Sequence, residues 1–366
     1  MRHGRLSIFL FALLALIVAA CNGGASDTTS IEETTIPATA DTTAPPGGTV
    51  RILSHDSFAG GVDEETFAAF TEETGVTVEV VPAGDAGGAV NQAILTKDNP
   101  VADVLFGVDN TFLSRALGED IFVPYESPVL GRVDPRLVID EEMRVTPIDY
   151  GDVCLNYDIA WFEENELDPP DDLDDLVAPE YEGLLVVEDP AASSPGLAFL
   201  LATIERYGSE WPGYWESLVA NGVAVVNDWD TAYYSNFTRY GGEDPIVVSY
   251  ASSPPAEVMF AEEPLESAPT AVVTDGCFRQ IEFAGILAGT ENEAAAGQLI
   301  DFMLSPEFQE QIPTTWFVFP ANVDVELPEV FAENTVIPED PITMDPAEID
   351  QNRETWLDQW RDIVTP

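Results

Sequence analysis

Basic side chains are scarce in this chain of 366 residues, which contains 13 lysine and arginine residues against 67 aspartate and glutamate residues. Lys97 is its only lysine, and the formal net charge is −54. Nucleic acids and anionic lipid surfaces are bound through clusters of Lys and Arg, so nucleic acid is excluded as an expected partner. The acidity has two interpretations. It is either a solvated surface shaped by salt or genome composition, or a field that steers a cationic ligand.

Histidine and cysteine are also rare, with two and three residues. His3 lies at the extreme N-terminus, which leaves His55 and two later cysteines as a poor ligand set for a metal, so no metal site is predicted. The chain has no Gly-Lys-Ser/Thr phosphate loop, no His-Glu-x-x-His and no Gly-x-Ser-x-Gly motif. We therefore predict no catalytic residue and no cofactor. A His55–Asp56 catalytic pair and a carboxylate-dependent extracellular hydrolase stay open as alternatives.

Long apolar runs are absent except near the N-terminus, where Arg2 and Arg5 precede the segment from Leu6 to Ala20. About 15 apolar residues are too few to span a bilayer, but they match the pattern of a secretory signal. The run closes on Val18-Ala19-Ala20-Cys21, which resembles a bacterial lipobox. We therefore predict that residues 1–20 are a lipoprotein signal peptide and that Cys21 is lipidated and anchors the protein to the membrane. Ordinary cleavage and an uncleaved anchor are the alternatives.

The segment after Cys21 contains no aromatic residue and is rich in Thr, Ala, Gly and Pro. Such a composition cannot bury enough apolar surface to fold, so residues 21–48 are predicted to be the lipidated cysteine and a flexible linker. From Thr49 onward the composition is mixed, and this body exceeds the size of a single hydrophobic core. Two lobes are therefore expected.

Period-two and period-3.6 patterns alternate in the first part of the body. Strands are expected over 49–53, 76–81 and 102–106, with helices over 64–74 and 91–95. This order indicates an α/β lobe with a largely parallel sheet, whose ligands lie beyond the carboxyl ends of the strands. Asp56, Asp85 and Asp109 occupy loops at or near such ends.

The second part of the body repeats the pattern. Strands are expected over 147–158, 183–187, 223–226 and 245–250, and helices over 197–207, 298–304 and 346–363. Ser193 or Ser194 can cap the first of these helices, and Pro195 suits its first turn. This helix start has two interpretations, an ordinary cap or an anion site.

Three aromatic residues follow predicted elements beside carboxylates or in Pro- and Ser-rich turns: Trp229, Tyr250 and Trp316. Aromatic faces near carboxylates suit a flat, cationic heteroaromatic ligand through stacking and cation–π attraction. Each residue taken alone is also typical of a core or surface position.

A family resemblance is carried by several stretches in order. They are Asp56-Ser57-Phe58-Ala59, residues 102–110, Asp149-Tyr150-Gly151, Asp189-Pro190 with Ser194-Pro195-Gly196-Leu197, Trp229, Ser249-Tyr250, residues 302–309, Ile312-Pro313-Thr314 and Pro320-Ala321-Asn322-Val323. Together they resemble the thiamine-binding receptors of bacterial ABC importers over nearly all of 49–366. The resemblance implies an α/β, two-lobed periplasmic-binding-protein fold of type II. It also implies a monomeric extracytoplasmic receptor that binds thiamine or a thiamine phosphate and has an ABC permease as its partner.

The resemblance also assigns ligand contacts, namely Asp85, Ser193, Trp229, Tyr250 and Trp316, with Ser193 where a phosphate would be met. His55 and Asp56 occupy the loop after the first strand, and Asp109 lies in the matched stretch 102–110. The chain departs from the family where His55 replaces a tyrosine, and where Val62 and Ala256 stand near a family tryptophan and tyrosine. Fewer stacking rings leave the affinity and the choice between thiamine and its phosphates open.

The resemblance further implies that residues 149–158 and 276–283 are two strands that cross between the lobes. Lobe 1 is then 49–148 completed by about 278–315, and lobe 2 is 149–277 completed by about 316–366. Cys154 and Cys277 would meet at the hinge as a disulfide. The same fold serves receptors for ferric iron, with Tyr233-Tyr234 as the nearest candidate ligands here, and for polyamines. A surface interaction protein is the remaining alternative.

Overall fold

The computed structural model describes residues 48–261 and 263–365. The expected signal peptide, the expected lipidation residue Cys21 and almost all of the expected linker lie outside the described residues. No helix within the described ranges is both long and apolar enough to cross a membrane.

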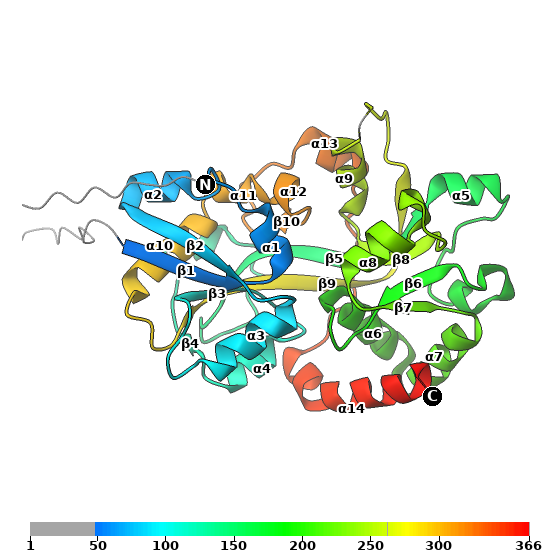
Figure 1. Cartoon of the computed structure of the whole chain (residues 1–366), viewed down its shortest axis with the longest axis horizontal. Helices are drawn as coiled ribbons and strands as arrows, with labels where there is room; N and C mark the ends of the chain where they lie inside the picture. Colours follow the sequence, from blue (N-terminus) through cyan, green and yellow to red (C-terminus); the bar gives the residue numbers. More distant parts are fainter. Residues whose placement is uncertain (1–47, 262, 366) are drawn as a thin grey trace, which may run out of the picture. The chain divides into compact units, whose positions relative to one another are not determined.

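The described strands join in one mixed sheet with the order β2-β1-β3-β9-β5-β8-β6-β7, to which β4 and β10 add at the side (Figure 1). The strands are β1 (Gly48–Ser54), β2 (Val76–Pro82), β3 (Val104–Asp109), β4 (Phe122–Val123), β5 (Thr146–Asp158), β6 (Leu185–Glu188), β7 (Ala224–Val226), β8 (Ile246–Tyr250), β9 (Thr270–Leu287) and β10 (Phe319–Pro320). We call β2, β1 and β3 the first half of the sheet, and β8, β6 and β7 the second half.

Helices connect most of these strands. They are α1 (Asp56–Gly61), α2 (Ala68–Thr74), α3 (Ala86–Leu95), α4 (Leu113–Gly118), α5 (Ile159–Glu164), α6 (Ser194–Tyr207), α7 (Trp211–Ala220), α8 (Trp229–Thr231), α9 (Ser253–Met259), α10 (Glu293–Met303), α11 (Pro306–Gln309), α12 (Ile312–Thr315), α13 (Glu329–Asn334) and α14 (Pro346–Val364). The elements expected from the sequence are present with shifted ends, and the helix expected over 64–74 begins only at Ala68.

The two long strands β5 and β9 run antiparallel through the centre of the sheet and link its halves. Strand β9 pairs with β3 of the first half through residues 282–286, and β5 pairs with β8 of the second half through residues 153–157. Within each half the neighbouring strands are parallel. The expectation of a largely parallel sheet therefore holds for the two halves and is wrong for the centre, where the chain crosses between them.

Side-chain caps start α1, α3 and α6, which follow the parallel strands β1, β2 and β6. The His55 imidazole accepts a hydrogen bond from the Phe58 amide at 3.2 Å, and Asp85 accepts one from Gly88 at 2.6 Å. Ser193 caps α6, with Pro195 in the first turn, as the sequence predicts. These caps hold the loops beyond the strand ends at defined positions, because each satisfies a backbone amide that the helix leaves unpaired.

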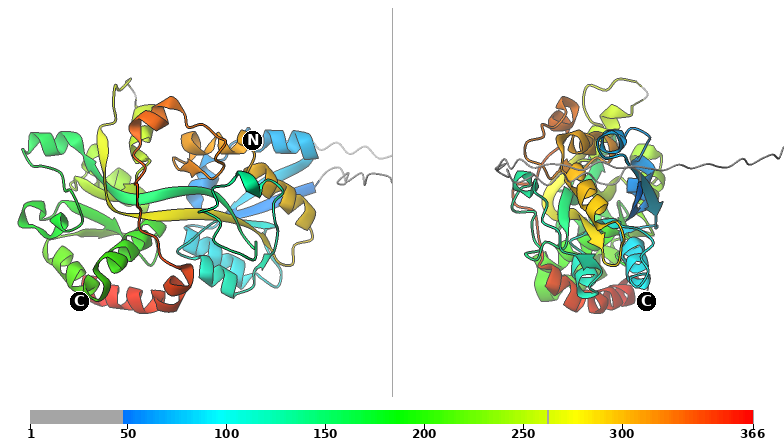
Figure 2. Two further views of the ribbon diagram at one scale, coloured as in Figure 1. Left: turned by 180° about the vertical axis from the view of Figure 1, so that it is seen from behind. Right: turned by 90° about the vertical axis from the view of Figure 1, so that its left-hand side faces the viewer.

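Segments late in the chain pack on both halves. Trp316 stacks on Phe58 of α1, and Asn322 donates to the carbonyl of Leu304, so the expected lobe boundary after residue 315 separates residues that pack together. Helix α14, red in Figure 2, contacts α4, which follows β3, and also α7, which precedes β7. The C-terminal helix is thus a second connection between elements of the two halves.

Candidate functional site

Three carboxylates lie opposite one another on adjacent strands at the centre of the sheet. Glu282 of β9 is the register partner of Asp109 on β3 and also of Asp149 on β5. Directly opposite residues share a face of a sheet and have Cβ atoms about 4.5–5.5 Å apart. Asp109 and Asp149 are buried, and the Glu282 side chain is 15 % exposed. We call Asp109, Asp149 and Glu282 the carboxylate row.

Burial makes the charged form of this row costly. Asp109 Oδ1 accepts hydrogen bonds from the amides of Thr111 and Phe112 at 2.7 and 3.3 Å. Asp109 Oδ2 and Asp149 Oδ1 are buried without a hydrogen-bond partner among the residues described. Burial, and then the charge of Glu282, raises the pKa of Asp149 well above its usual value, and burial likewise raises the pKa of Asp109. Asp109 and Asp149 therefore retain protons to higher pH than surface carboxylates do, and a bound cation would stabilise their ionised forms.

His55 contacts the row from the start of α1. Its Nε2 lies 3.3 Å from Glu282 Oε1, while Nδ1 accepts from the helix amide, so the geometry puts the proton on Nε2. Burial lowers the pKa of His55, whereas the charges of Glu282, Asp109 and Asp56 raise it. The combined effect of the three acids is larger, so the pKa of His55 lies above its usual value. Gly107, with φ of +87°, lies against the imidazole, where any Cβ would collide with the ring.

Tyr250 reaches the same region from the end of β8. Its hydroxyl donates to Gln280 Oε1 at 3.1 Å, and Gln280 precedes Glu282 by two residues, so both point to one face of β9. Burial raises the pKa of Tyr250, and the charges of Glu282 and Asp109 raise it further. Gly151 makes room for the ring, because a Cβ there would stand 2.8 Å from Tyr250 Cδ1. Tyr250 therefore forms an aromatic wall beside the row.

The start of α6 brings further polar groups from the second half. Ser193 is buried and commits its hydroxyl to the cap, accepting from the Gly196 amide at 3.4 Å. The Ser194 side chain opposes the upward shift of the pKa of Asp109, and its buried hydroxyl makes no hydrogen bond within the described residues. Glu188, at the end of β6, is 1 % exposed, and neither carboxylate oxygen has a partner within the described part of the chain. Burial raises the pKa of Glu188 well above its usual value.

Trp229 opens α8 beside this region. Its indole nitrogen donates to the Ser249 hydroxyl at 2.9 Å, and Ser249 precedes Tyr250 on β8. The indole stacks on Tyr233 with ring centroids 4.9 Å apart. Tyr234 also contacts the ring edge-on, and Trp229 is only partly buried, so part of a rigidly held indole stays accessible.

Trp316 follows α12 and packs on α1, the helix after strand β1 of the first half. Its indole nitrogen donates to the carbonyl of Phe58 at 3.1 Å, and its ring stacks on Phe58 with centroids 4.9 Å apart. Gly61 permits this approach, since a Cβ there would overlap the indole. Trp316 thus packs on α1, the helix that His55 begins.

Asp56 and Asp85 lie just beyond the carboxyl ends of β1 and β2, as the sequence predicts. Asp56 Oδ1 accepts from the Gly84 amide at 3.0 Å, and Asp85 caps α3. Both residues are exposed. Asp85 lines a cleft of about 430 Å³ that α3, α4 and α14 share. Of the predicted ligand contacts, the structure brings His55, Asp109 and Tyr250 together around Glu282.

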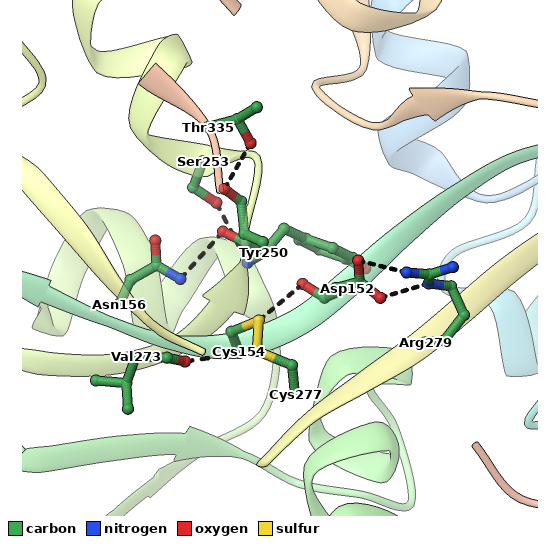
Figure 3. Close-up of a disulfide and its surroundings, with 10 residues drawn as sticks. Asp152, Cys154, Asn156, Tyr250, Ser253, Val273, Cys277, Arg279 and Thr335 are labelled. Atoms are coloured by element: carbon green, nitrogen blue, oxygen red, sulfur yellow. Dashed lines mark hydrogen bonds and ion pairs between the residues drawn. A yellow bond between two sulfur atoms is a disulfide. The ribbon is translucent and has the colours of Figure 1, made fainter. Parts of the chain in front are cut away.

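Cys154 of β5 and Cys277 of β9 are joined by a disulfide (Figure 3). Both sulfurs are buried, and Ala251 and Val272 pack around them. Next to the disulfide, Arg279 forms an ion pair with Asp152, with Nη2 to Oδ2 at 3.0 Å. The crossing strands are therefore joined by a covalent bond and an ion pair at the point where the chain passes between the halves.

Tyr233 and Tyr234, the candidate ligands for ferric iron, differ in burial. The Tyr233 hydroxyl is buried and donates to Glu257 Oε1 at 2.9 Å, within a network that includes Arg239 and Tyr240. Tyr234 is 51 % exposed. No group of three or more His, Cys, Asp or Glu residues in the described ranges is placed to hold a metal ion together.

Sequence reasoning did not select Asp149, Glu188, Gln280 or Glu282 as site residues. Gln280 and Glu282 could have been found, because they are polar residues with period-two spacing that alternate with the apolar residues Ile281 and Phe283. Polar residues on one face of a buried strand indicate a lined cavity or a ligand. The pairing of Glu282 with two aspartates required the sheet register.

Known protein families include chains similar to this one. Residues 99–341 match the model of a family described as bacterial extracellular solute-binding protein. The "Thiamine-binding periplasmic protein" of Escherichia coli strain K12 is 29 % identical over 317 residues, covering 86 % of this chain and 93 % of that protein.

Two solved structures illustrate the likeness in three dimensions. One is called "Periplasmic thiamin binding protein" and superposes with a TM-score of 0.76 at 26 % identity, covering 88 % of this chain and 99 % of that chain. Iron-bound HitA from Pseudomonas aeruginosa superposes with a TM-score of 0.71 at 21 % identity, covering 87 % and 99 %, and shares the fold.

Proposed function

Because this chain belongs to the bacterial extracellular solute-binding protein family, we propose that it is an extracytoplasmic receptor that captures thiamine and delivers it to the permease of an ABC importer. The names of its relatives support this ligand. The single observation that carries the proposal is the carboxylate row, because buried, unpaired carboxylates beside Tyr250 form a site for a flat organic cation.

The cationic ring of thiamine is proposed to lie over the row, between Tyr250 and His55. Charge attraction is strong in such a water-poor site, and it offsets the desolvation that raises the pKa of Asp109 and Asp149. His55 is partly buried beside Glu282 and places an N–H rather than a carboxylate on that side, so it orients Glu282.

Ligand capture is proposed to close the two lobes on each other, with the crossing strands β5 and β9 as the hinge. A ligand shifts such an equilibrium only through contacts that the closed state makes better. Ser194 begins α6 in the opposite half, and its buried hydroxyl makes no hydrogen bond within the described residues, so it is the type of group that closure would pair. We propose lobe 1 as 49–148 completed by about 278–315 and lobe 2 as 149–277 completed by about 316–366. The packing of Trp316 on α1 supports a boundary slightly after residue 315.

Trp229 is proposed to stack on a ligand ring with the indole face opposite Tyr233. Replacing Trp229 with alanine should therefore weaken thiamine binding about 5- to 30-fold, since an aromatic or cation–π contact contributes about 1–2 kcal/mol. Isothermal titration calorimetry measures the change. Trp161→Ala is the matched control, because Trp161 is a partly buried tryptophan that packs on Phe162 of α5. Equal affinities for the wild type and Trp229→Ala would contradict the stacking role.

Cys21 is proposed to carry a lipid that holds the receptor near its permease. Expression in bacteria fed a radiolabelled fatty acid should label the wild-type protein, and a Cys21→Ser variant should stay unlabelled and move to the soluble fraction. Labelling of the Cys21→Ser variant, or an unlabelled wild-type protein, would remove this part of the proposal.

The proposed ligand is tested by titrating the purified protein with thiamine, with spermidine and ferric ion as parallel arms. Saturable heat at micromolar thiamine is the expected result. Spermidine is the most informative comparison, because it is also a cation and the same carboxylates could bind its amines. Saturation by spermidine alone would identify a polyamine as the ligand instead of thiamine, and a colour change with iron alone would identify ferric iron. If none of the three solutes gives saturation, the proposal that the protein captures them is rejected.

A further inference from the structure

Three arginines line one cleft in a chain whose net charge is −54. Arg115 lies on α4, whereas Arg353 and Arg361 lie on α14, and all three line the cleft of about 430 Å³ that Asp85 also lines. Mutual repulsion disfavours placing three guanidinium groups together. In such an acidic protein, the composition also gives no reason to expect three arginines in one cleft. Their field favours an anion in the cleft.

Arg353 is the central group and lacks an adequate partner. The residue is 8 % exposed, and its Nε has no hydrogen-bond partner among the described residues. Its one ion pair runs from Nη1 to Glu354 Oε1 at 3.5 Å, and that carboxylate is 80 % exposed. A buried guanidinium with an unused N–H is costly unless something pairs with it. Its donors form a rigid fork that matches the oxygens of phosphate.

The rest of the cleft orients this fork. The Arg353 guanidinium lies over the Phe112 ring, 4.4 Å from its centroid, and this contact fixes its position beside the start of α4. Burial lowers the pKa of Arg353, and Arg115 and Arg361 lower it further, while Glu354 and Asp109 raise it. Arg115 forms no ion pair with any carboxylate in the described ranges. Arg361 pairs only with Asp358 of its own helix, at 3.0 Å.

The cleft also lies next to the carboxylate row. Phe112 links the two sites, because its ring contacts the Arg353 guanidinium and its amide donates to Asp109 Oδ1 at 3.3 Å. Gly87 of α3 and Ala192, just before α6, complete the lining, so elements of both halves of the sheet contribute. Asp85 and Glu354 are the acidic groups of the cleft, and both are more exposed than Arg353.

We propose that this cleft is an oxyanion site that binds a phosphate or diphosphate group, with Arg353 as the bidentate donor and Arg115 and Arg361 beside it. The site is distinct from the start of α6, where Ser193 is committed to its cap. The oxyanion has two possible sources, free phosphate in solution or the phosphorylated end of a ligand whose cationic ring occupies the carboxylate row. The second source rests on the proposed function, and the first does not.

The test is calorimetric titration of the full chain with three probes: thiamine, thiamine diphosphate and inorganic pyrophosphate. In the wild type, thiamine diphosphate should bind at least about 10-fold more tightly than thiamine if the oxyanion belongs to the ligand. Pyrophosphate alone should bind if the site takes the free ion. In Arg353→Gln, whichever of these two signals the wild type shows should fall at least about 10-fold, and thiamine binding should be unchanged.

Arg132→Gln is the matched control, because Arg132 is half-exposed and meets Asp324 outside the cleft. Arg361→Gln is the second test variant, since Arg361 is exposed and its loss should not affect folding. It should reduce the same signal by a smaller factor. The proposal is overturned if pyrophosphate does not bind and the diphosphate has no advantage, or if these signals survive in both cleft variants. Pyrophosphate binding without thiamine binding would retain the oxyanion site and reject thiamine as the ligand.

Discussion

Replacing Glu282 with glutamine is expected to weaken thiamine binding about 10- to 100-fold at neutral pH. Glu282 is the member of the carboxylate row that touches both aspartates, so its charge lies at the centre of the proposed cation site. A hydrogen bond or contact to a charged partner contributes about 1.5–3 kcal/mol, and about 1.4 kcal/mol corresponds to a factor of ten. Calorimetric titration gives the affinity, and Glu291→Gln, at an exposed glutamate, is the control. Equal affinities of wild type and Glu282→Gln would contradict the site.

The same site predicts that thiamine affinity rises with pH. Burial and Glu282 hold the pKa of Asp149 above its usual value, and a bound cation favours the ionised form, so binding releases a proton. His55, whose pKa is also raised, loses its positive charge over the same range, and Asp109 and Glu188 lose protons, which all favour the cation. Tyr250 stays neutral, because burial raises its pKa above 10. In Glu282→Gln the dependence on pH should be weaker. An affinity that falls from pH 4.5 to 7.5 would reject this linkage.

The ligand-free protein should show the opposite trend in stability. The folded-state pKa values of Asp149, Glu188 and His55 lie above their usual values, so the stability these groups provide is present at low pH. It decreases as pH rises through the raised pKa values. Denaturant unfolding with and without thiamine, over the same pH range, separates the two trends.

Removing the Cys154–Cys277 disulfide is expected to lower the free energy of unfolding by about 2–5 kcal/mol, mainly because an open chain gains entropy when it unfolds. The two residues are 123 positions apart, so the disulfide closes a long loop. Alanine is the suitable replacement in the double variant, since Ala251 and Val272 make the site apolar. Urea denaturation measures the difference.

The reduced wild-type protein is the matched control and should approach the double alanine variant in stability. Thiamine affinity should change less than stability, because the Asp152–Arg279 ion pair still joins the crossing strands. Thiol labelling of the unreduced, denatured protein should leave both cysteines unmodified. If both react, the disulfide is absent in the isolated protein.

Much of the architecture could be predicted because it depends on local patterns. The β-rich segment at 245–250, the helix beginning at Ser194 and the long C-terminal helix all show the period of their apolar residues directly. The predicted α/β, type II fold with two crossing strands is confirmed, since β5 and β9 link the halves and the structural likeness includes solute-binding proteins of this kind.

Asp109 shows why local patterns are not sufficient. In the sequence it looks like a loop residue after a strand, whereas in the structure it ends β3 and is fully buried. Polar residues usually indicate exposure, because burying a carboxylate is costly. That expectation fails in this structure, because β3, β5 and β9 place three acidic side chains opposite one another at the proposed ligand site. The contacts proposed for Asp56 and Asp85 likewise depend on tertiary distances, and both side chains serve backbone amides in the structure.

By itself the sequence determined the α/β class, the family resemblance, and the aromatic and acidic residue types that a cationic ligand needs. Those properties depend on composition and on short-range spacing. Only the tertiary structure decided which acids form the carboxylate row and which arginines share a cleft. Glu282 lies more than a hundred residues from Asp149 in the chain, and Arg353 lies even further from Arg115, so only the sheet register and the packing of α14 bring these charges together.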